Sequence, residues 1–184
     1  MDDILQLLTD ARRGDLAAQK RLFDLLSDGM VLLCRRYVKN NEDAEEAMLD
    51  GFYKFFTHLA TFTYQNEATL IGWIKKIMIN ECLMQLRKKN AFVMLSESVA
   101  ESLEYEDEAL NRLSAKEIFE LILRLPSGYR TVFNLYEIEG MDHKEIANLL
   151  GIAEGTSKSQ LSKAKALLQR NLSQRGSDYA KRKK

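Results

Sequence analysis

The segment KEIANLLGIAEGTSKSQLSKAKALL, residues 144–168, is the strongest indication of the fold of the second half of the chain. Its apolar residues follow helical spacing on both sides of a glycine, which predicts a helix-turn-helix. The tight corner of such a pair needs a small residue where the helices cross, and Ala147 meets this requirement. Four residues later, Gly151 can adopt the left-handed backbone conformation that ends a helix.

The second helix of this pair, from about Glu154, has an inward and an outward face. The spacing predicts that its inward residues are Ser157, Leu161, Ala164 and Leu168. The opposite side carries only small residues, namely Gly155, Ser159, Ser162 and Ala166. Cations flank these small residues, namely Lys158, Lys163, Lys165 and Arg170. Ser157 is polar for an inward position, and we expect its hydroxyl to bond the backbone.

The outward face of this helix is typical of a DNA-binding surface. Small residues at its centre let the helix enter the major groove, while lysines on both sides reach phosphates. A solvated helix with an ordinary basic face is the alternative interpretation. The small residue at the corner, together with the small outward positions, favours DNA binding.

The composition of the whole chain predicts an all-α fold. The chain has a single proline, Pro126, and nine glycines, too few for the turns of a many-stranded protein. Leu, Ala, Lys, Glu and Arg dominate, and these residues form helices well. A helix from about Leu110 is expected to end at Leu125, because Pro126 cannot continue it. Further helices are expected over 126–139, 143–150 and 154–168.

The first half of the chain also reads as successive helices. They are expected over residues 15–38, 42–59 and 68–89, with a break at Lys39-Asn40-Asn41 and a connection over 61–66. The chain then divides into two small helical domains, 1–90 and 111–172, joined by an acidic linker over 91–110. Residues 173–184 form a basic tail that we expect to be disordered.

Charge is segregated along the chain, although its net value is zero. Residues 1–90 carry 13 basic and 13 acidic groups, residues 93–109 six acidic groups and no basic one, and residues 154–184 nine basic against two acidic groups. Such segregation is how an electrostatic footprint on nucleic acid appears in a sequence. The acidic N-terminus and the short apolar runs lack the features of a signal peptide or a membrane span, so a cytoplasmic location is expected.

The residues that could carry chemistry do not form a catalytic or metal-binding pattern. Cys34 and Cys82, with His58 and His143, match no zinc spacing, and burial of the two cysteines as free thiols is the favoured interpretation. The carboxylates from Glu42 to Asp50 have no accompanying nucleophile, histidine or glycine-rich phosphate loop. We therefore expect no enzymatic activity, no metal and no cofactor.

Residues in both halves of the chain resemble a known family, the extracytoplasmic-function group of sigma-70-type RNA polymerase sigma factors. Its promoter-binding domain is similar to Leu125-Pro126, Tyr129-Arg130-Thr131-Val132-Phe133, Glu145-Ile146-Ala147, Leu150-Gly151-Ile152 and Gly155-Thr156. Its polymerase-docking helix is similar to Asp43-Ala44-Glu45-Glu46 with Asp50, Phe52 and Lys54. Its strand-opening helix is similar to Trp73, Ile77, Asn80, Leu86 and Arg87. The resemblance covers about residues 10–172. The family usually has Gln at Leu49, a polar residue at Met84 and an apolar one at Ser157.

The resemblance implies three surfaces. The final helix would read an upstream promoter element through Thr156, Lys158, Ser159 and Lys163. The helix around Trp73, with the connection before it, would bind the downstream element through Phe62, Tyr64, Lys75, Lys76, Asn80, Arg87 and Lys88. Core polymerase would be bound at the clamp helices of its largest subunit, through Asp43, Glu46, Asp50 and Phe52. A core role is favoured for Trp73 itself, whereas Phe62 and Tyr64 are better placed to contact a flipped base.

The predicted function is therefore a sigma factor, whose partners are core RNA polymerase, promoter DNA and an anti-sigma factor, with no small-molecule substrate. The alternative is an autonomous helix-turn-helix regulator with an N-terminal dimerisation or sensor module. Zero net charge separates the two, because an autonomous DNA binder must generate its own salt-dependent affinity. A purely structural helical adaptor is a third hypothesis, which leaves the basic last helix unexplained.

Overall fold

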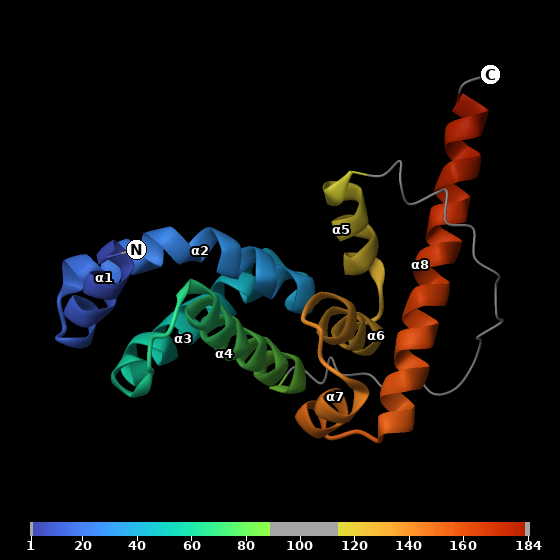
Figure 1. The fold of residues 1–184 in the computed structure, drawn as a ribbon. Coiled ribbons are helices and arrows are strands. Elements are labelled where there is room, and N and C mark those ends of the chain that lie inside the picture. Colours follow the sequence, from blue (N-terminus) through green and yellow to red (C-terminus); the bar gives the residue numbers. More distant parts are fainter. Residues whose placement is uncertain (1, 89–113, 183–184) are drawn as a thin grey trace. The chain divides into compact units, whose positions relative to one another are not determined.

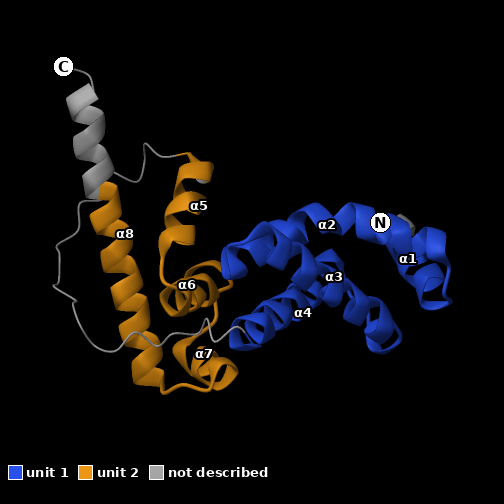
Figure 2. Ribbon diagram, turned by 180° about the vertical axis from the view of Figure 1, so that it is seen from behind, with its two compact units in different colours: residues 1–91 blue, residues 92–184 orange. Residues whose placement is uncertain are grey.

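The computed structural model describes residues 2–88 and 114–182, and all regular structure in these ranges is helical. The chain divides into two compact units, residues 1–91 and residues 92–184 (Figure 2). The predicted acidic linker over 91–110 lies outside the described residues. The all-α prediction is confirmed.

Unit 1 is built from four α-helices and one 3₁₀ turn (Figure 1). Helices α2, α3 and α4 pack against one another in all three pairings, and α1 packs on α2. The elements are α1 (Asp2–Arg12), α2 (Leu16–Val38), α3 (Asn41–His58), η1 (Leu59–Thr61) and α4 (Glu67–Lys88).

The boundaries of α2 and α3 follow from local chemistry. The Asp15 carboxylate caps α2 by accepting hydrogen bonds from the backbone N–H groups of Ala17 and Ala18. Lys39 ends α2 in a positive-φ conformation, φ 69°. The Asn40 side chain then caps α3 by accepting from the N–H of Glu42 at 2.8 Å. The predicted break at 39–41 is confirmed.

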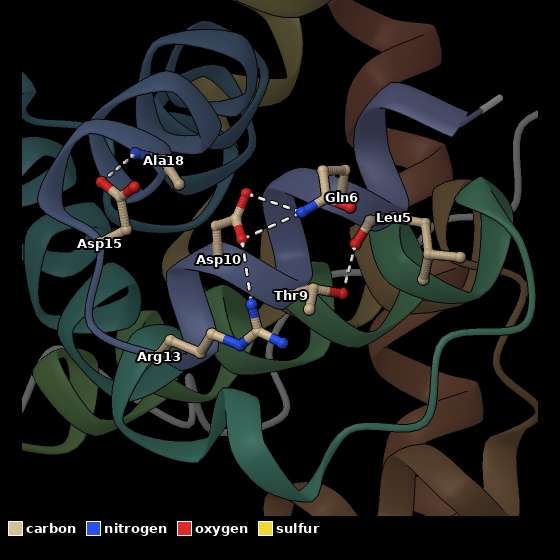
Figure 3. Close-up of polar contacts among 7 residues, drawn as sticks. All are labelled: Leu5, Gln6, Thr9, Asp10, Arg13, Asp15 and Ala18. Carbon is tan, nitrogen blue, oxygen red and sulfur yellow. Dashed lines mark hydrogen bonds and ion pairs between the residues drawn. The ribbon is translucent and has the colours of Figure 1, made fainter.

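Helix α1 was absent from the helices expected from sequence. Its buried residues Leu7, Leu8 and Ala11 follow helical spacing. On its polar side, Gln6 donates to both carboxylate oxygens of Asp10, each at 3.0 Å, and Arg13 lies 3.8 Å from the same carboxylate (Figure 3). These i, i+3 and i, i+4 pairs stabilise a short helix whose apolar face alone gives a weak pattern.

The core of unit 1 is apolar and closely packed. Tyr37, Phe55, Ile74 and Met78 are each almost fully buried. Gly51 leaves room on α3 for the Met78 side chain of α4, because a Cβ at this position would lie 2.3 Å from Sδ of Met78.

Both cysteines are buried free thiols, as expected, and they lie in this core. The Cys82 thiol approaches the carbonyl oxygen of Cys34 at 3.9 Å, which joins α4 to α2. A side-chain hydrogen bond with Cys34 raises the pKa of the Cys82 thiol, and burial raises it further. The Cys82 thiol is therefore protonated in the folded protein. No helix within the described residues has the length and apolar character to cross a membrane.

Within residues 114–182, unit 2 packs three short helices along one long helix, and a π-helical turn packs on two of the short ones (Figure 1). Its central apolar cluster joins Leu125 and Tyr129 to Ala164. Its elements are α5 (Ala115–Arg124), α6 (Ser127–Phe133), η3 (Asn134–Ile138), α7 (His143–Leu150) and α8 (Glu154–Arg182).

The corner between α5 and α6 follows from Pro126 and a buried arginine. Helix α5 begins in a capping box made by Ser114 and Glu117, and Leu125 in extended conformation ends it before the proline. The Arg130 guanidinium then donates to the carbonyl oxygens of Leu123 at 3.4 Å and Leu125 at 2.8 Å. Burial lowers the pKa of Arg130 from its ordinary value, because it removes the guanidinium from water. The two carbonyl oxygens replace part of that lost hydration by accepting hydrogen bonds from it.

One expectation about unit 2 is corrected. The helix expected over 126–139 changes at Asn134 from α to π geometry. The disorder expected of residues 173–184 stays a prediction, because the side chains of this segment lie outside the described part of the chain (Figure 2).

Candidate promoter-binding and polymerase-docking sites

The corner before the last helix has the predicted geometry. Asp142 and Glu145 form a reciprocal capping box at the start of α7, with both bonds 2.8 Å long. Gly151 ends α7 in the left-handed conformation, φ 69° and ψ 38°. The N–H groups of Gly151 and Ile152 both donate to the carbonyl oxygen of Ala147, at 2.9 and 3.1 Å. These bonds satisfy the carbonyl that a helix end leaves free.

Helix α8 presents the predicted faces. Ser157, Leu161 and Ala164 are buried, and Leu168 is partly buried against the same core. The small residues Gly155, Ser159 and Ser162 are exposed, whereas Ala166 is half-buried. An added Cβ at Gly155 would meet no atom within 4 Å, so this side of the helix is open.

The buried Ser157 hydroxyl is bonded differently from the expectation. A hydrogen bond of 2.9 Å joins Oγ of Ser157 to Nδ1 of His143 at the start of α7, where sequence suggested a bond to the backbone. The imidazole of His143 stacks on the ring of Tyr136, with centroids 4.5 Å apart and planes 24° apart. The polar residue on the inward face thus has a side-chain partner on the neighbouring helix.

The residues predicted to contact the upstream element lie near one another on α8, but not all are equally available. Lys158 pairs with Glu154 at 2.6 Å, and the hydrogen bond from Lys158 lowers the pKa of Glu154. Ser159 is exposed and donates its hydroxyl proton to the carbonyl oxygen of Thr156 at 3.1 Å. Thr156 and Lys163 are half-buried.

Lys165, the cation on the other flank, pairs with Glu137 of η3 at 2.7 Å. This contact holds α8 to the π-helical turn and was invisible in the sequence. Because its ammonium group is held in this ion pair, Lys165 is less available to bind DNA than a lysine that extends into solvent.

The cations and the amide predicted to bind the downstream element lie on α4. Lys76, Asn80, Arg87 and Lys88 are exposed, and Lys75 is half-buried. Met84, on the same helix, is 41% exposed. Because Asn80, Arg87 and Lys88 are all exposed within about two turns of α4, they can act on one stretch of nucleic acid.

Aromatic residues from α3, α4 and the connection between them form a cluster around Trp73. Trp73 stacks on Phe62, with centroids 4.5 Å apart and planes 8° apart, and also packs against Phe55 at 5.2 Å. These contacts agree with a core role for Trp73, although part of its surface is exposed. Phe62 therefore has one ring face covered, and Tyr64 is half-buried beside it in the chain.

Arg12, at the end of α1, was missed by the sequence analysis. Its Nε donates to the carbonyl oxygen of Leu59 at 3.1 Å, and its Nη2 donates to that of Phe62. This arginine ties the connection that carries Phe62 to the first helix. No local sequence signal could reveal a contact across 47 residues.

Helix α3 presents an acidic face with an apolar centre. Glu42, Glu45, Glu46 and Asp50 are exposed, and Asp43 is half-buried. Leu49 and Tyr53, which the sequence analysis did not assign to this surface, are 55% and 73% exposed. We call Glu46, Leu49, Asp50 and Tyr53 the acidic face of α3; their spacing places them on one side of the helix.

Phe52 does not belong to that face, which corrects its assignment as a docking residue. Its side chain is only 3% exposed and packs against Phe23 at 4.7 Å, Phe55 at 6.2 Å and Phe56 at 6.0 Å. A ring in this position stabilises the unit and offers no surface to a partner. Lys54 also turns toward α4, where Nζ lies 2.7 Å from Oε1 of the buried Glu81.

The fold and these surfaces together define a class of protein: an all-helical protein with a C-terminal helix-turn-helix domain. Two family models match the chain, sigma-70 region 2 over residues 22–92 and sigma-70 region 4 over residues 115–168. The chain belongs to the sigma-70 family of RNA polymerase sigma factors, in its extracytoplasmic-function (ECF) group.

Individual proteins show the same relationship. The ECF sigma factor SigW of Bacillus subtilis is 25% identical over 182 residues, covering 92% of this chain and 96% of SigW. The ECF sigma factor SigM of Mycobacterium tuberculosis is 28% identical over 167 residues, covering 91% of this chain and 83% of SigM. The solved structure of the sigma factor RpoE of Bartonella quintana, in complex with the anti-sigma factor NepR, has a similar fold. Its TM-score is 0.52 at 22% identity, and the match covers 84% of this chain and 96% of that one.

Proposed function

We propose that this sigma factor binds core RNA polymerase, directs it to a set of promoters and helps to open them, with no chemistry of its own. The observation that carries the proposal is that two surfaces have opposite charge: the exposed face of α3 is acidic, and the outward side of α8 is basic. In this proposal the factor needs no cofactor and no small-molecule substrate. It acts in the cytoplasm, where the polymerase is.

Polymerase docking is assigned to the acidic face of α3, with Asp43 at its edge. Its exposed carboxylates would pair with basic groups on the clamp helices of the largest polymerase subunit. Leu49 and Tyr53 would supply the apolar area that a stable protein interface buries at its centre.

Promoter recognition is assigned to α8 and α4. Helix α8 would enter the major groove at the upstream element, with Thr156, Lys158, Ser159 and Lys163 in contact with DNA. Helix α4 would bind the downstream element with its exposed cations and Asn80. The Phe62 and Tyr64 rings would contact a base that leaves the stack, since each stacked base stabilises a complex by about 1–3 kcal/mol.

An autonomous helix-turn-helix regulator is the alternative, and it predicts different behaviour. Such a regulator would bind duplex DNA tightly by itself, whereas a polymerase subunit obtains most of its DNA affinity from the enzyme. The acidic face of α3 suits a protein partner better than a duplex. An anti-sigma factor is a further proposed partner, since a similar fold is found bound to one.

The proposal is tested with the purified chain, core polymerase and a genomic promoter library, by mapping transcript start sites. We expect promoter-specific transcripts that require the chain, and co-purification of the chain with core polymerase. Absence of both results would overturn the proposal. Tight duplex binding by the chain without polymerase would support the regulator instead.

A charge reversal on α8 separates recognition from docking. Lys163→Glu should abolish promoter-specific initiation, because it places a carboxylate against DNA phosphates, and should leave polymerase binding unchanged. Lys116→Glu, the same reversal at an exposed position on α5, is the control and should retain both activities. Loss of polymerase binding by a folded Lys163→Glu variant would show that the two surfaces are wrongly separated.

A further inference from the structure

A set of side-chain contacts joins the π-helical turn η3 to both helices of the helix-turn-helix. Tyr136 of η3 stacks on His143 of α7, and His143 bonds the Ser157 hydroxyl of α8 at 2.9 Å. Glu137 of η3 pairs with Lys165 of α8 at 2.7 Å. Helix α8 is thus held at two points, eight residues apart, which is about 12 Å along a helix.

The contact at Ser157 is the more demanding of the two. Its side chain is fully buried, whereas Lys165 and Glu137 are 39% and 33% exposed. A buried hydroxyl without a partner loses its bond to water and gains nothing in return. The bond to His143 therefore favours one setting of α8 relative to α7.

The imidazole is itself fixed from the other side. Because Tyr136 covers one face of the ring at a centroid distance of 4.5 Å, the stack limits how far His143 can follow Ser157 if α8 shifts. The carboxylate of Glu154, at the start of α8, is close enough to interact with His143 electrostatically. We call Tyr136, His143 and Ser157 the α7–α8 positioning cluster.

We infer that His143 is a positioning residue for promoter recognition: through Ser157 it sets the orientation at which α8 presents its outward face. The inference rests on the proposed function of α8. Ser159 lies two residues after Ser157, and Lys163 lies six residues after it, so the bond is made in the part of α8 that would contact DNA.

This role predicts a particular division of effects. Contacts to base edges depend on angle and distance, whereas phosphate attraction tolerates small movements. Loss of the α7–α8 positioning cluster should therefore lower discrimination between promoter sequences and leave general DNA affinity unchanged. A merely structural role would lower both together, in proportion to the fraction of unfolded unit 2.

The test uses the full chain with core polymerase and three templates: an intact promoter, one with its upstream element replaced, and one with its downstream element replaced. The variants are His143→Phe, which keeps a ring to stack on Tyr136, His143→Asn, which keeps a polar group, Ser157→Ala, and the double variant His143→Phe/Ser157→Ala. Asn148→Ala, at an exposed position on α7, is the control. Circular dichroism establishes the folded fraction of each variant at the assay temperature.

We expect His143→Phe and Ser157→Ala each to lower upstream-element discrimination about three- to tenfold, the effect of one lost hydrogen bond. The double variant should lose no more than either single variant, because both remove the same bond. His143→Asn should recover part of the loss, and downstream-element discrimination should not change.

Three outcomes would overturn the inference: unchanged discrimination in folded single variants, losses that add in the double variant, or equal losses on all three templates. Failure of the proposed function would appear differently. The unmodified chain would then show no polymerase-dependent, upstream-element-dependent transcription, and the inference would fall with it.

Discussion

In unit 1, helix α4 is held mainly by apolar side chains, with one ion pair between its buried Glu81 and Lys54 of α3. In unit 2, the first turns of α8 bury fewer large apolar side chains and are held by a hydrogen bond and an ion pair as well as by packing. Leu70, Ile74 and Met78 of α4 are all fully buried. The corresponding part of α8 buries a serine, Ser157, next to His143. Two helices proposed to bind the same promoter are thus positioned by different kinds of contact.

The difference has a physical consequence for how each helix works. Apolar packing depends on buried area and shape and has no preferred bond direction, so it makes a rigid unit. A hydrogen bond depends on direction and fails within a few tenths of an ångström. Apolar packing therefore contributes most to the position of α4, whereas a small number of polar atoms set the orientation of α8. Four substitutions test this contrast.

The largest expected effect is on unit 1. Phe52→Ala removes a ring that is only 3% exposed and should destabilise the unit by about 3–5 kcal/mol, because a cavity replaces packed atoms. The single tryptophan, Trp73, lies in unit 1, so urea denaturation followed by its fluorescence reports on that unit alone. Tyr53→Ala, at the exposed neighbour, should change stability by less than about 0.5 kcal/mol and should weaken polymerase binding. Equal loss of stability from both substitutions would contradict the assignment of Phe52 to the core.

The second substitution removes a charged hydrogen-bond donor from unit 2. Arg130→Met leaves the carbonyl oxygens of Leu123 and Leu125 without this donor and should cost about 2–3 kcal/mol. Thermal denaturation followed by circular dichroism measures the change. The unfolding transition of unit 1, followed by Trp73 fluorescence, should be the same in the variant and in the unmodified chain. If Arg130→Met proved neutral, the polar character attributed to unit 2 would not matter for its stability.

A third experiment concerns the contact between α3 and α4. Gly51→Ala places a Cβ 2.3 Å from Sδ of Met78, and such overpacking costs about 1–3 kcal/mol. Alanine also favours the helix by about 1 kcal/mol, so the net loss should be on the order of 1 kcal/mol. Gly72→Ala is the matched control within α4, because a Cβ there meets nothing within 4 Å. It should stabilise unit 1, and a shift of both variants in the same direction would refute the close-packing argument.

The smallest expected effect is at the start of α8. Glu154→Gln frees Lys158 from its ion pair and should raise the affinity of the holoenzyme for promoter DNA about twofold, since an exposed pair is weak. The gain should shrink as salt increases. Glu120→Gln, the same change at an exposed position on α5, is the control. Equal gains from both variants would reflect net charge rather than Lys158.

The pH dependence of this pair has a definite sign. Because the hydrogen bond from Lys158 lowers the pKa of Glu154 in the folded chain, the pair stabilises fully only above the ordinary pKa that this carboxyl has in the unfolded chain. That contribution is lost as the pH falls through the lowered folded pKa. Thermal stability of the unmodified chain and of Glu154→Gln, compared across acidic pH, checks this direction.

The sequence predicted those parts of the fold that depend on near neighbours along the chain. Gly151 has the left-handed conformation expected of it, and α7 has the predicted bounds His143–Leu150. The inward positions of α8 follow the same spacing. Such features are set by backbone sterics and by the period of a helix, and both can be read within a few residues.

Contacts between distant elements could not be predicted in this way. The bond from His143 to Ser157 spans 14 residues, and the bond from Arg12 to the carbonyl oxygen of Leu59 spans 47. Phe52 was misassigned because a helix can bury an aromatic residue beside an exposed acidic face, and only packing shows which side it takes.

The two buried thiols have a practical consequence for experiments on this protein. Cys34 and Cys82 are the only cysteines in the chain, and neither is accessible in the folded state. Maleimide dyes react with thiolates, so the native chain should remain essentially unlabelled. A cysteine introduced at an exposed position in each unit would then be the sole site of attachment there. Fluorescence energy transfer between two such dyes could follow the distance between unit 1 and unit 2 as the factor joins polymerase and opens DNA.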